Sequence, residues 1–217
     1  MTFFLIKKII FTPTKSTIKM MKKLFLLAIL LLPFTIFAQN NSGLKKSNFI
    51  LKGGATFSKV IGDDIRSDFK VGFQAGLISR IQMKSGALDL GVIYNQKGFT
   101  ESEGQNVKIS VNYLTIPVHF IIPTNSGSSN FYVGPEINIF LNNKATLGDV
   151  SVTFSEGVSP LDLSFAAGLE LIVTSNILID FGGSFGLIKA YEVEDYSGTQ
   201  TLGNNISFNA GMKFIIN

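Results

Sequence analysis

An alternation of apolar and polar side chains constrains the fold of this chain more than any other feature. In the stretch LDLSFAAGLELIVT, residues 161 to 174, every odd position is Leu, Phe, Ala or Val, whereas the even positions include Asp162, Ser164, Glu170 and Thr174. Successive side chains of a β-strand point to opposite faces. The pattern therefore predicts a long strand with one apolar face and one face that is small, polar or charged.

The same alternation continues from residue 48 to the C-terminus and predicts an all-β domain over residues 48–217, in which no stretch has convincing helical periodicity. The expected strands are 48–58, 69–82, 87–99, 108–122, 130–142, 159–174, 177–190 and 204–217. The pattern is less regular in 87–99, 108–122, 130–142 and 177–190, where Ile93, Phe140 or Leu178 falls on the polar side.

Strand and link lengths favour a membrane environment over a soluble sandwich with one wet face. The expected strands have 11 to 16 residues, whereas strands of soluble proteins have about 5 to 6 and a tilted membrane-spanning strand needs roughly 9 to 11. The links contain ten, four, eight, seven, sixteen, two and thirteen residues in chain order. Long links at one end and short turns at the other are typical of outer-membrane barrels with periplasmic termini. The chain is therefore expected to form an eight-stranded antiparallel up-and-down transmembrane β-barrel; a soluble periplasmic barrel or sandwich is the structural alternative.

A barrel in lipid reverses the usual sidedness of a sheet. No water reaches a free backbone N–H or C=O in hydrocarbon, so the sheet must close, with its apolar face toward lipid and its polar face inside. Glycines such as Gly168 and Gly182 are expected to leave room inside for long charged side chains, and Tyr94 and Tyr132 to lie at the membrane interfaces.

The polar faces carry charged residues that an eight-stranded barrel would bury. Because an isolated buried charge is very costly, these residues are expected to pair. The inward set is Lys52, Lys70, Arg80, Asp89, Glu136, Glu170, Asp180 and Lys213. We expect Lys52, Arg80 and Lys213 to form a salt-bridged plug with Glu136, Glu170 and Asp180. The alternative is a path for ions or small solutes lined by these groups.

The N-terminal residues read as a leader. The segment MMKKLFLLAILLLPFTIFAQ, residues 20 to 39, has a cationic start, an apolar run and Ala38 before a polar stretch, as in a secretory signal peptide with its core at 20–38. Residues 1–19 are an upstream extension or a long cationic region, and residues 39–47 are an expected flexible linker. Six of the 19 basic residues lie in the leader. The remaining chain has a net charge of −2, which argues against a nucleic-acid partner.

The composition offers little for catalysis or for a cofactor. The chain has no cysteine and a single histidine, His119, so a thiolate site and a transition-metal cage are not expected. His119 is a candidate general base, but no glycine-flanked serine motif accompanies it. We therefore expect no enzymatic activity, no cofactor and no metal; a lipid-modifying enzyme is the weakest alternative.

Five segments carry a family resemblance, in this order: LKGGATFSKV (51–60), GVIYNQKGF (91–99), YLTIPVHF (113–120), FYVGPEINIFL (131–141) and LSFAAGLEL (163–171). Together they resemble the PorT-like outer-membrane β-barrel proteins, often called the porin family, over residues 48–217. The resemblance implies an integral outer-membrane barrel of a Gram-negative cell.

The expected function is a structural role or binding through extracellular loops. A narrow channel for ions or small solutes is the alternative. The expected partners are outer-membrane lipid and lipopolysaccharide, the barrel-insertion machinery during biogenesis, and a protein or ligand at the extracellular loops.

Overall fold

A computed structural model describes residues 47–62, 67–101, 107–154, 158–189, 191–194 and 200–216. The expected leader, residues 1–38, and all of the expected linker except Ser47 lie outside the described residues. Among the described residues, no helix has the length and apolar character needed to cross a membrane.

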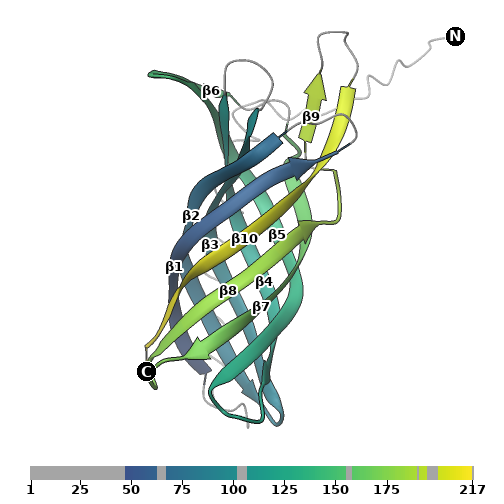
Figure 1. Cartoon of the computed structure of the whole chain (residues 1–217). Coiled ribbons are helices and arrows are strands. Elements are labelled where there is room, and N and C mark those ends of the chain that lie inside the picture. Colours follow the sequence, from purple (N-terminus) through teal and green to yellow (C-terminus); the bar gives the residue numbers. More distant parts are fainter. Residues whose placement is uncertain are drawn as a thin grey trace, which may run out of the picture. The chain divides into compact units, whose positions relative to one another are not determined.

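Eight long antiparallel strands form a closed ring (Figure 1). Each strand of the ring pairs with the next in sequence, and β1 pairs with β10 over Phe49 to Ile61, which closes the sheet. The ring consists of β1 (Ser47–Ile61), β2 (Ser67–Met83), β3 (Gly86–Glu101), β4 (Lys108–Pro123), β5 (Ser129–Leu147), β7 (Leu161–Ile172), β8 (Ile177–Gly186) and β10 (Gln200–Ile216). The expected eight-stranded up-and-down barrel is confirmed.

Two short strands that the alternation pattern did not predict extend the ring at one end. The strand β6 (Val150–Phe154) pairs with the end of β5, and β9 (Tyr191–Glu194) pairs with the start of β10. Both lie in segments expected to be links, and β8 ends at Gly186 rather than at residue 190. Strands of four or five residues contain too few alternations to be distinguished from a loop in the sequence.

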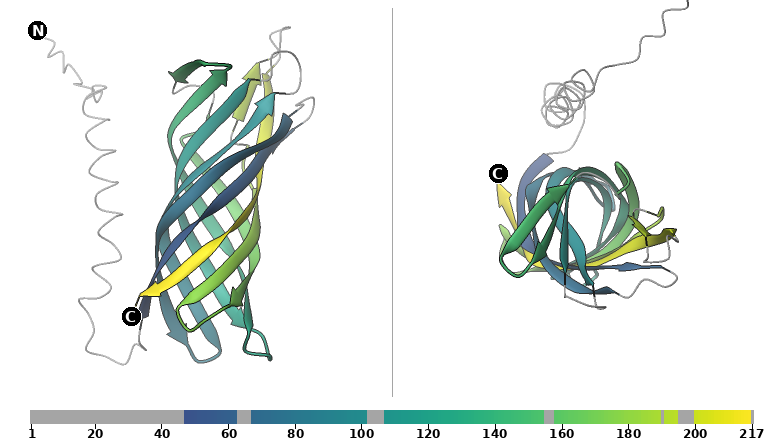
Figure 2. Two further views of the ribbon diagram at one scale, coloured as in Figure 1. Left: turned by 60° about the vertical axis from the view of Figure 1, so that its left-hand side comes forward. Right: turned by 90° about the horizontal axis from the view of Figure 1, so that it is seen from above.

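Side chains of the barrel wall have the sidedness expected in lipid. On β7, Phe165 is 47% exposed on the outside, whereas Glu170 is fully buried on the inside. Phenylalanines on the outer faces of neighbouring strands are also exposed, among them Phe73, Phe181 and Phe208. A view along the axis shows the ring of strands around a common interior (Figure 2). The apolar face therefore surrounds the barrel, and the polar face lines its lumen.

The lumen also contains apolar clusters. Ile50, Ile78 and Ile93 pack together near the end that carries the strand termini Ser47 and Ile216. A second cluster of Val60, Phe99, Val111 and Tyr113 lies nearer the opposite end. Ile93 and Leu178, which break the alternation in the sequence, are indeed inside. The polar groups of the lumen thus lie between apolar layers.

A bulge in β5 directly follows Phe140, which is in phase with the inward residues Glu136 and Asn138. The register with β4 shifts between Asn112 and Tyr113, so that Tyr113 pairs with Phe140 and Asn112 with Asn142. Leu141 is the extra residue, and the alternation resumes with opposite parity beyond it. Phe140 packs against the inner cluster around Val111 and Tyr113. Beyond the bulge, Asn142 faces outward and is exposed.

The two ends of the barrel differ in the length of their connections. Residues 84–85, 124–128 and 173–176 make short turns at the end where the C-terminus lies (Figure 1). The longer connections and the β5–β6 hairpin lie at the other end. Gly148 has a φ of 55° in the hairpin turn, a left-handed conformation that favours glycine.

Candidate functional site

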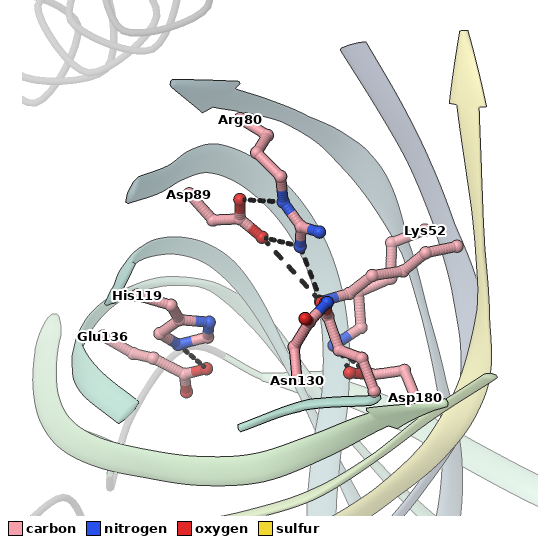
Figure 3. Close-up of polar contacts among 9 residues, drawn as sticks. Lys52, Arg80, Asp89, His119, Asn130, Glu136 and Asp180 are labelled. Carbon is pink, nitrogen blue, oxygen red and sulfur yellow. Dashed lines mark hydrogen bonds and ion pairs between the residues drawn. The ribbon is translucent and has the colours of Figure 1, made fainter. Parts of the chain in front are cut away.

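The lumen contains an ion-pair network (Figure 3). At its centre is Lys213, which lies near three carboxylates. It projects inward from β10 and is fully buried. Its Nζ lies 2.5 Å from Glu170 Oε1, 3.4 Å from Asp180 Oδ1 and 3.9 Å from Asp89 Oδ2. The ammonium group also lies 4.9 Å from the ring centroid of Tyr132, within range of a cation–π interaction.

Arg80 on β2 joins two carboxylates from opposite parts of the ring. Its Nε and one terminal nitrogen each donate to Asp89 at 2.7 Å, and the same terminal nitrogen donates to Glu170 Oε1 at 2.7 Å. The forked guanidinium geometry suits this bidentate contact. Because Glu170 is on β7, the contact spans the lumen from wall to wall.

Lys52 completes the network with a 2.6 Å contact to Asp180 Oδ2. Asn130 donates to the second oxygen of Glu170 at 3.1 Å. We call the six charged residues the central network: Lys52, Arg80, Asp89, Glu170, Asp180 and Lys213. None is more than 6% exposed. Three cations face three carboxylates, so the network has no net formal charge, a condition for burying so many ionic groups.

The strand register creates the network. Lys52 pairs with Lys213 across β1 and β10, and Glu170 pairs with Asp180 across β7 and β8. Like charges in such positions repel each other. The two pairs nevertheless meet because β10 lies beside β8, with Gly211 opposite Asp180. Each like-charged pair is therefore neutralised by the other.

The structure brings together five of the six residues expected to form the plug and places Glu136 elsewhere. Glu136 Oε1 lies 3.2 Å from His119 Nε2, and its other oxygen accepts from Ser164 at 3.3 Å. Lys70, from the wider inward set, donates to the Val71 carbonyl. His119 therefore occupies the position beside Glu136 that was expected for a lysine or arginine.

Asp89 is the member of the central network that the expected pairing omitted. Its partner Arg80 is on the adjacent strand, and β2 and β3 are joined by a two-residue turn that puts Met83 opposite Gly86. This turn fixes Arg80 opposite Asp89. A four-residue link was expected here, residues 83–86, and it gives the same register, with Gln82 opposite Ala87 and Arg80 opposite Asp89. The hairpin register that the two strand ends imply is the signal in the sequence that could have identified the pair.

Tyr132 is also in the lumen, which corrects its expected place at the membrane interface. It is 2% exposed, and its ring stacks on His119 with centroids 5.0 Å apart. The ring lies over Gly168 and Gly182, where a side chain on either residue would overlap it. These glycines thus accommodate an aromatic ring rather than the long charged side chains expected there.

A second polar group lies beside Glu136. Asn138 accepts from Thr115 at 2.7 Å and from Lys97 at 3.3 Å, and it donates to Ser164 at 2.9 Å. Ser164 in turn donates to Glu136. The carboxylate stands between the serine and His119, so Ser164 makes no direct contact with the imidazole in a serine–histidine arrangement. Among the described residues, no group of three or more His, Cys, Asp or Glu side chains is placed to hold a metal ion.

A closed antiparallel ring with an apolar outer face and a neutralised ionic interior defines the class of outer-membrane β-barrel proteins. The sequence comparison agrees with the fold. Residues 37–192 match the family model of the outer membrane protein beta-barrel domain. The chain belongs to this family, and its location is the outer membrane.

Several solved structures are similar to this chain. Neisserial surface protein A is 15% identical with a TM-score of 0.55, over 78% of this chain and 99% of that chain. The attachment invasion locus protein of Yersinia pestis is 17% identical with a TM-score of 0.46, over 78% and 99%. OprG from Pseudomonas aeruginosa is 15% identical with a TM-score of 0.43, over 81% and 98%. The comparison with curated proteins finds no significant match.

Proposed function

We propose that this outer-membrane barrel has a closed lumen and acts through its extracellular surface, as a structural or binding protein. In this proposal the short turns and the termini are periplasmic, and the long connections with the β5–β6 hairpin are extracellular. The resemblance to PorT-like proteins agrees with this arrangement. We propose that the chain is related to that group. The partners it implies are lipid and lipopolysaccharide around the barrel, the insertion machinery during biogenesis, and a protein or ligand at the loops.

The central network is the observation that carries the proposal. Eight strands enclose a lumen just wide enough to be filled by side chains. Here, Arg80 reaches Glu170 across that lumen at 2.7 Å, and Lys213 lies between Glu170 and Asp180. A solute crossing the barrel would have to separate these ion pairs in a low-dielectric interior, which is costly.

A narrow ion path is the second candidate, and one observation favours it. Asp162 Oδ1 and Asn205 Oδ1 are buried in the lumen and have no hydrogen-bond donor among the residues that the structure describes. The two side chains contact each other through a 3.4 Å bond from Asn205 to Asp162 Oδ2. Buried polar atoms without a protein partner are commonly satisfied by water. Water at this point would begin a hydrated path beside Lys97 and Asn138.

Single-channel recording in planar bilayers separates the two candidates. For a closed lumen, the full-length protein gives no conductance steps, and the charge-neutral variant Arg80→Ala/Glu170→Ala gives steps because it removes the contact across the lumen. Ser110→Ala, on the outer face, serves as the insertion-matched control and stays silent. Steps from the wild-type protein that Arg80→Ala or Glu170→Ala abolishes would instead establish the channel.

We also propose that the barrel is not an enzyme. The support is the arrangement at His119, where Glu136 separates the imidazole from Ser164. The test compares the lipid A and phospholipid profiles of cells that carry the wild-type protein or His119→Ala. Equal profiles are expected. A difference that appears only with the intact histidine would assign a lipid-modifying activity to the lumen.

A further inference from the structure

A row of three amides crosses the outer face of β3, β4 and β5. Gln96 Nε2 donates to Asn112 Oδ1 at 3.2 Å, and Asn112 Nδ2 donates to Asn142 Oδ1 at 2.7 Å. Gln96 pairs with Asn112, and Asn112 with Asn142, in the strand register. We call this row the amide ladder.

The amide ladder lies at the edge of the apolar belt. On β4, the outward residues from the short-turn end are Ile122, Phe120, Val118, Ile116 and Leu114, and Asn112 follows next. On β3, Tyr94 is the outward residue that precedes Gln96. Because burying side-chain amides in hydrocarbon is costly, we expect the boundary between hydrocarbon and lipid headgroups to lie at the ladder. Outward side chains beyond it therefore lie among headgroups.

Two lysines project outward just beyond the ladder. Lys108 on β4 is opposite Thr146, and Lys144 on β5 is opposite Ser110, so the two lysines are diagonal neighbours, roughly 7–8 Å apart at their backbones. Both are exposed, and neither has a salt bridge to any carboxylate in the part of the chain that the structure describes. Two neighbouring cations favour an anionic ligand.

Hydroxyl groups surround the lysines. Ser110 and Thr146 are their cross-strand partners, and Thr153 of β6 pairs with Lys144. The hydroxyls of Thr146 and Ser151 are 3.2 Å apart on the same face. The turn between β5 and β6 contains one carboxylate, that of Asp149, which lies at the tip of the hairpin. The outward surface thus combines hydroxyls and amides, which suit sugar hydroxyls, with two ammonium groups, which suit phosphate.

We propose that this surface, formed by the amide ladder, Lys108, Lys144 and the neighbouring hydroxyls, binds the phosphorylated sugar headgroup of an outer-leaflet glycolipid. The acyl chains of that lipid pack on the apolar belt below the ladder, and its phosphate lies between Lys108 and Lys144. The inference rests on the proposed orientation, in which the β5–β6 end faces the outer leaflet, and it adds a lipid class and a site to that proposal.

The experiment measures lipid binding by native mass spectrometry of the full-length barrel in detergent. The probes are bisphosphorylated lipid A and the same lipid after enzymatic removal of both phosphates. The test variant is Lys108→Gln/Lys144→Gln. The matched control is Lys84→Gln/Lys189→Gln, which removes two exposed lysines outside this surface. Heat-modifiable migration in gels shows that each variant is folded.

We expect the wild-type and control proteins to retain bisphosphorylated lipid A. The affinity of the Lys108/Lys144 variant for this lipid is expected to be about tenfold or more lower, because each basic residue near an anionic lipid surface contributes on the order of 1 kcal/mol. Equal binding of the dephosphorylated lipid, or equal binding by all variants, would overturn the proposal and leave only non-specific packing on the belt. Equally strong competition by a soluble sulfated oligosaccharide would also overturn it, because the ligand would then be a soluble polyanion. Orientation is checked separately by surface labelling, so an inverted barrel and a missing lipid site give different results.

Discussion

The phenol oxygen of Tyr132 occupies the space where a side chain of Gly182 would lie. Tyr132 is on β5 and Gly182 on β8, with Gly168 of β7 between them in the register. The ring thus crosses a whole strand without meeting a side chain. The ring of Tyr132 stacks on His119, and Lys213 Nζ lies 4.9 Å from the centroid of the ring. Gly168 and Gly182 together therefore leave the space in which Tyr132 contacts both His119 and Lys213.

Replacing Gly182 with alanine is expected to destabilise the barrel by about 1–3 kcal/mol, the usual cost of overpacking a filled interior. The added methyl group overlaps the Tyr132 hydroxyl more than the ring carbon beneath it, so Tyr132→Phe in the same chain should recover part of the loss. Urea unfolding of the barrel in lipid vesicles, followed by circular dichroism, measures the change.

Gly53→Ala provides the matched control for that experiment. A methyl group at Gly53 meets no other atom, and this glycine is on the outer face of β1 beside Lys52, which faces inward. We expect its stability to equal that of the wild-type protein. Equal losses at Gly53 and Gly182 would mean that the intrinsic conformational preference of glycine, rather than the space it leaves for Tyr132, determines the effect.

Breaking the central network at one residue is expected to cost more than removing a matched pair. Asp180→Leu leaves the Lys52 ammonium without its 2.6 Å partner in a buried site, and such a loss costs about 3–5 kcal/mol. The double variant Lys52→Met/Asp180→Leu should lose less than either single variant, because no unpaired charge from that salt bridge remains. A double-mutant cycle from urea unfolding gives the coupling. Additive losses would show that the two charges are solvated independently of each other.

Much of this fold could be predicted from the sequence because lipid imposes one rule on every strand. The alternation at residues 161–174 is almost perfect, since Leu163 and Phe165 face hydrocarbon while Asp162 and Glu170 face the lumen. The pattern fails where the two faces are not so different. Ile93 and Leu178 are apolar residues in a partly apolar lumen, and Leu141 changes the parity of β5 through a bulge that leaves no mark in composition.

The candidate site was less predictable because charge alone does not determine pairing. Sidedness identifies Lys52, Arg80 and Lys213 as inward cations, but three cations and several carboxylates allow many arrangements. The choice depends on register. The two-residue turn after Met83 sets Arg80 opposite Asp89, and the stacking of His119 on Tyr132 places an imidazole beside Glu136. These contacts follow from turn geometry and from glycines that admit an aromatic ring.

Arginine substitutions along the outer face of β4 should reveal the edge of the membrane. Val118 faces outward within the apolar belt, and Ser110 faces outward beyond the amide ladder on the same strand. Arginine near the middle of a bilayer costs about 2–4 kcal/mol in a barrel and little near its surface. Val118→Arg is therefore expected to lower the free energy of unfolding in vesicles by that amount, and Ser110→Arg to leave it nearly unchanged. Similar losses at both positions would show that the amide ladder does not mark the boundary of the hydrocarbon.

Single cysteines can determine the orientation of the barrel in intact cells, because the natural chain contains no cysteine. Asp149 is exposed at the tip of the β5–β6 hairpin, and Asn125 is exposed in the short turn between β4 and β5 at the opposite end. The proposed orientation predicts that a membrane-impermeant maleimide labels Asp149→Cys on intact cells and labels Asn125→Cys only after the outer membrane is permeabilised. Both sites are in turns and outside the lumen, so neither substitution removes a contact of the barrel wall. The reverse labelling pattern would place the termini outside the cell. Lys108 and Lys144, which are at the opposite end of the barrel, would then lie in the inner leaflet, where the proposed glycolipid is absent.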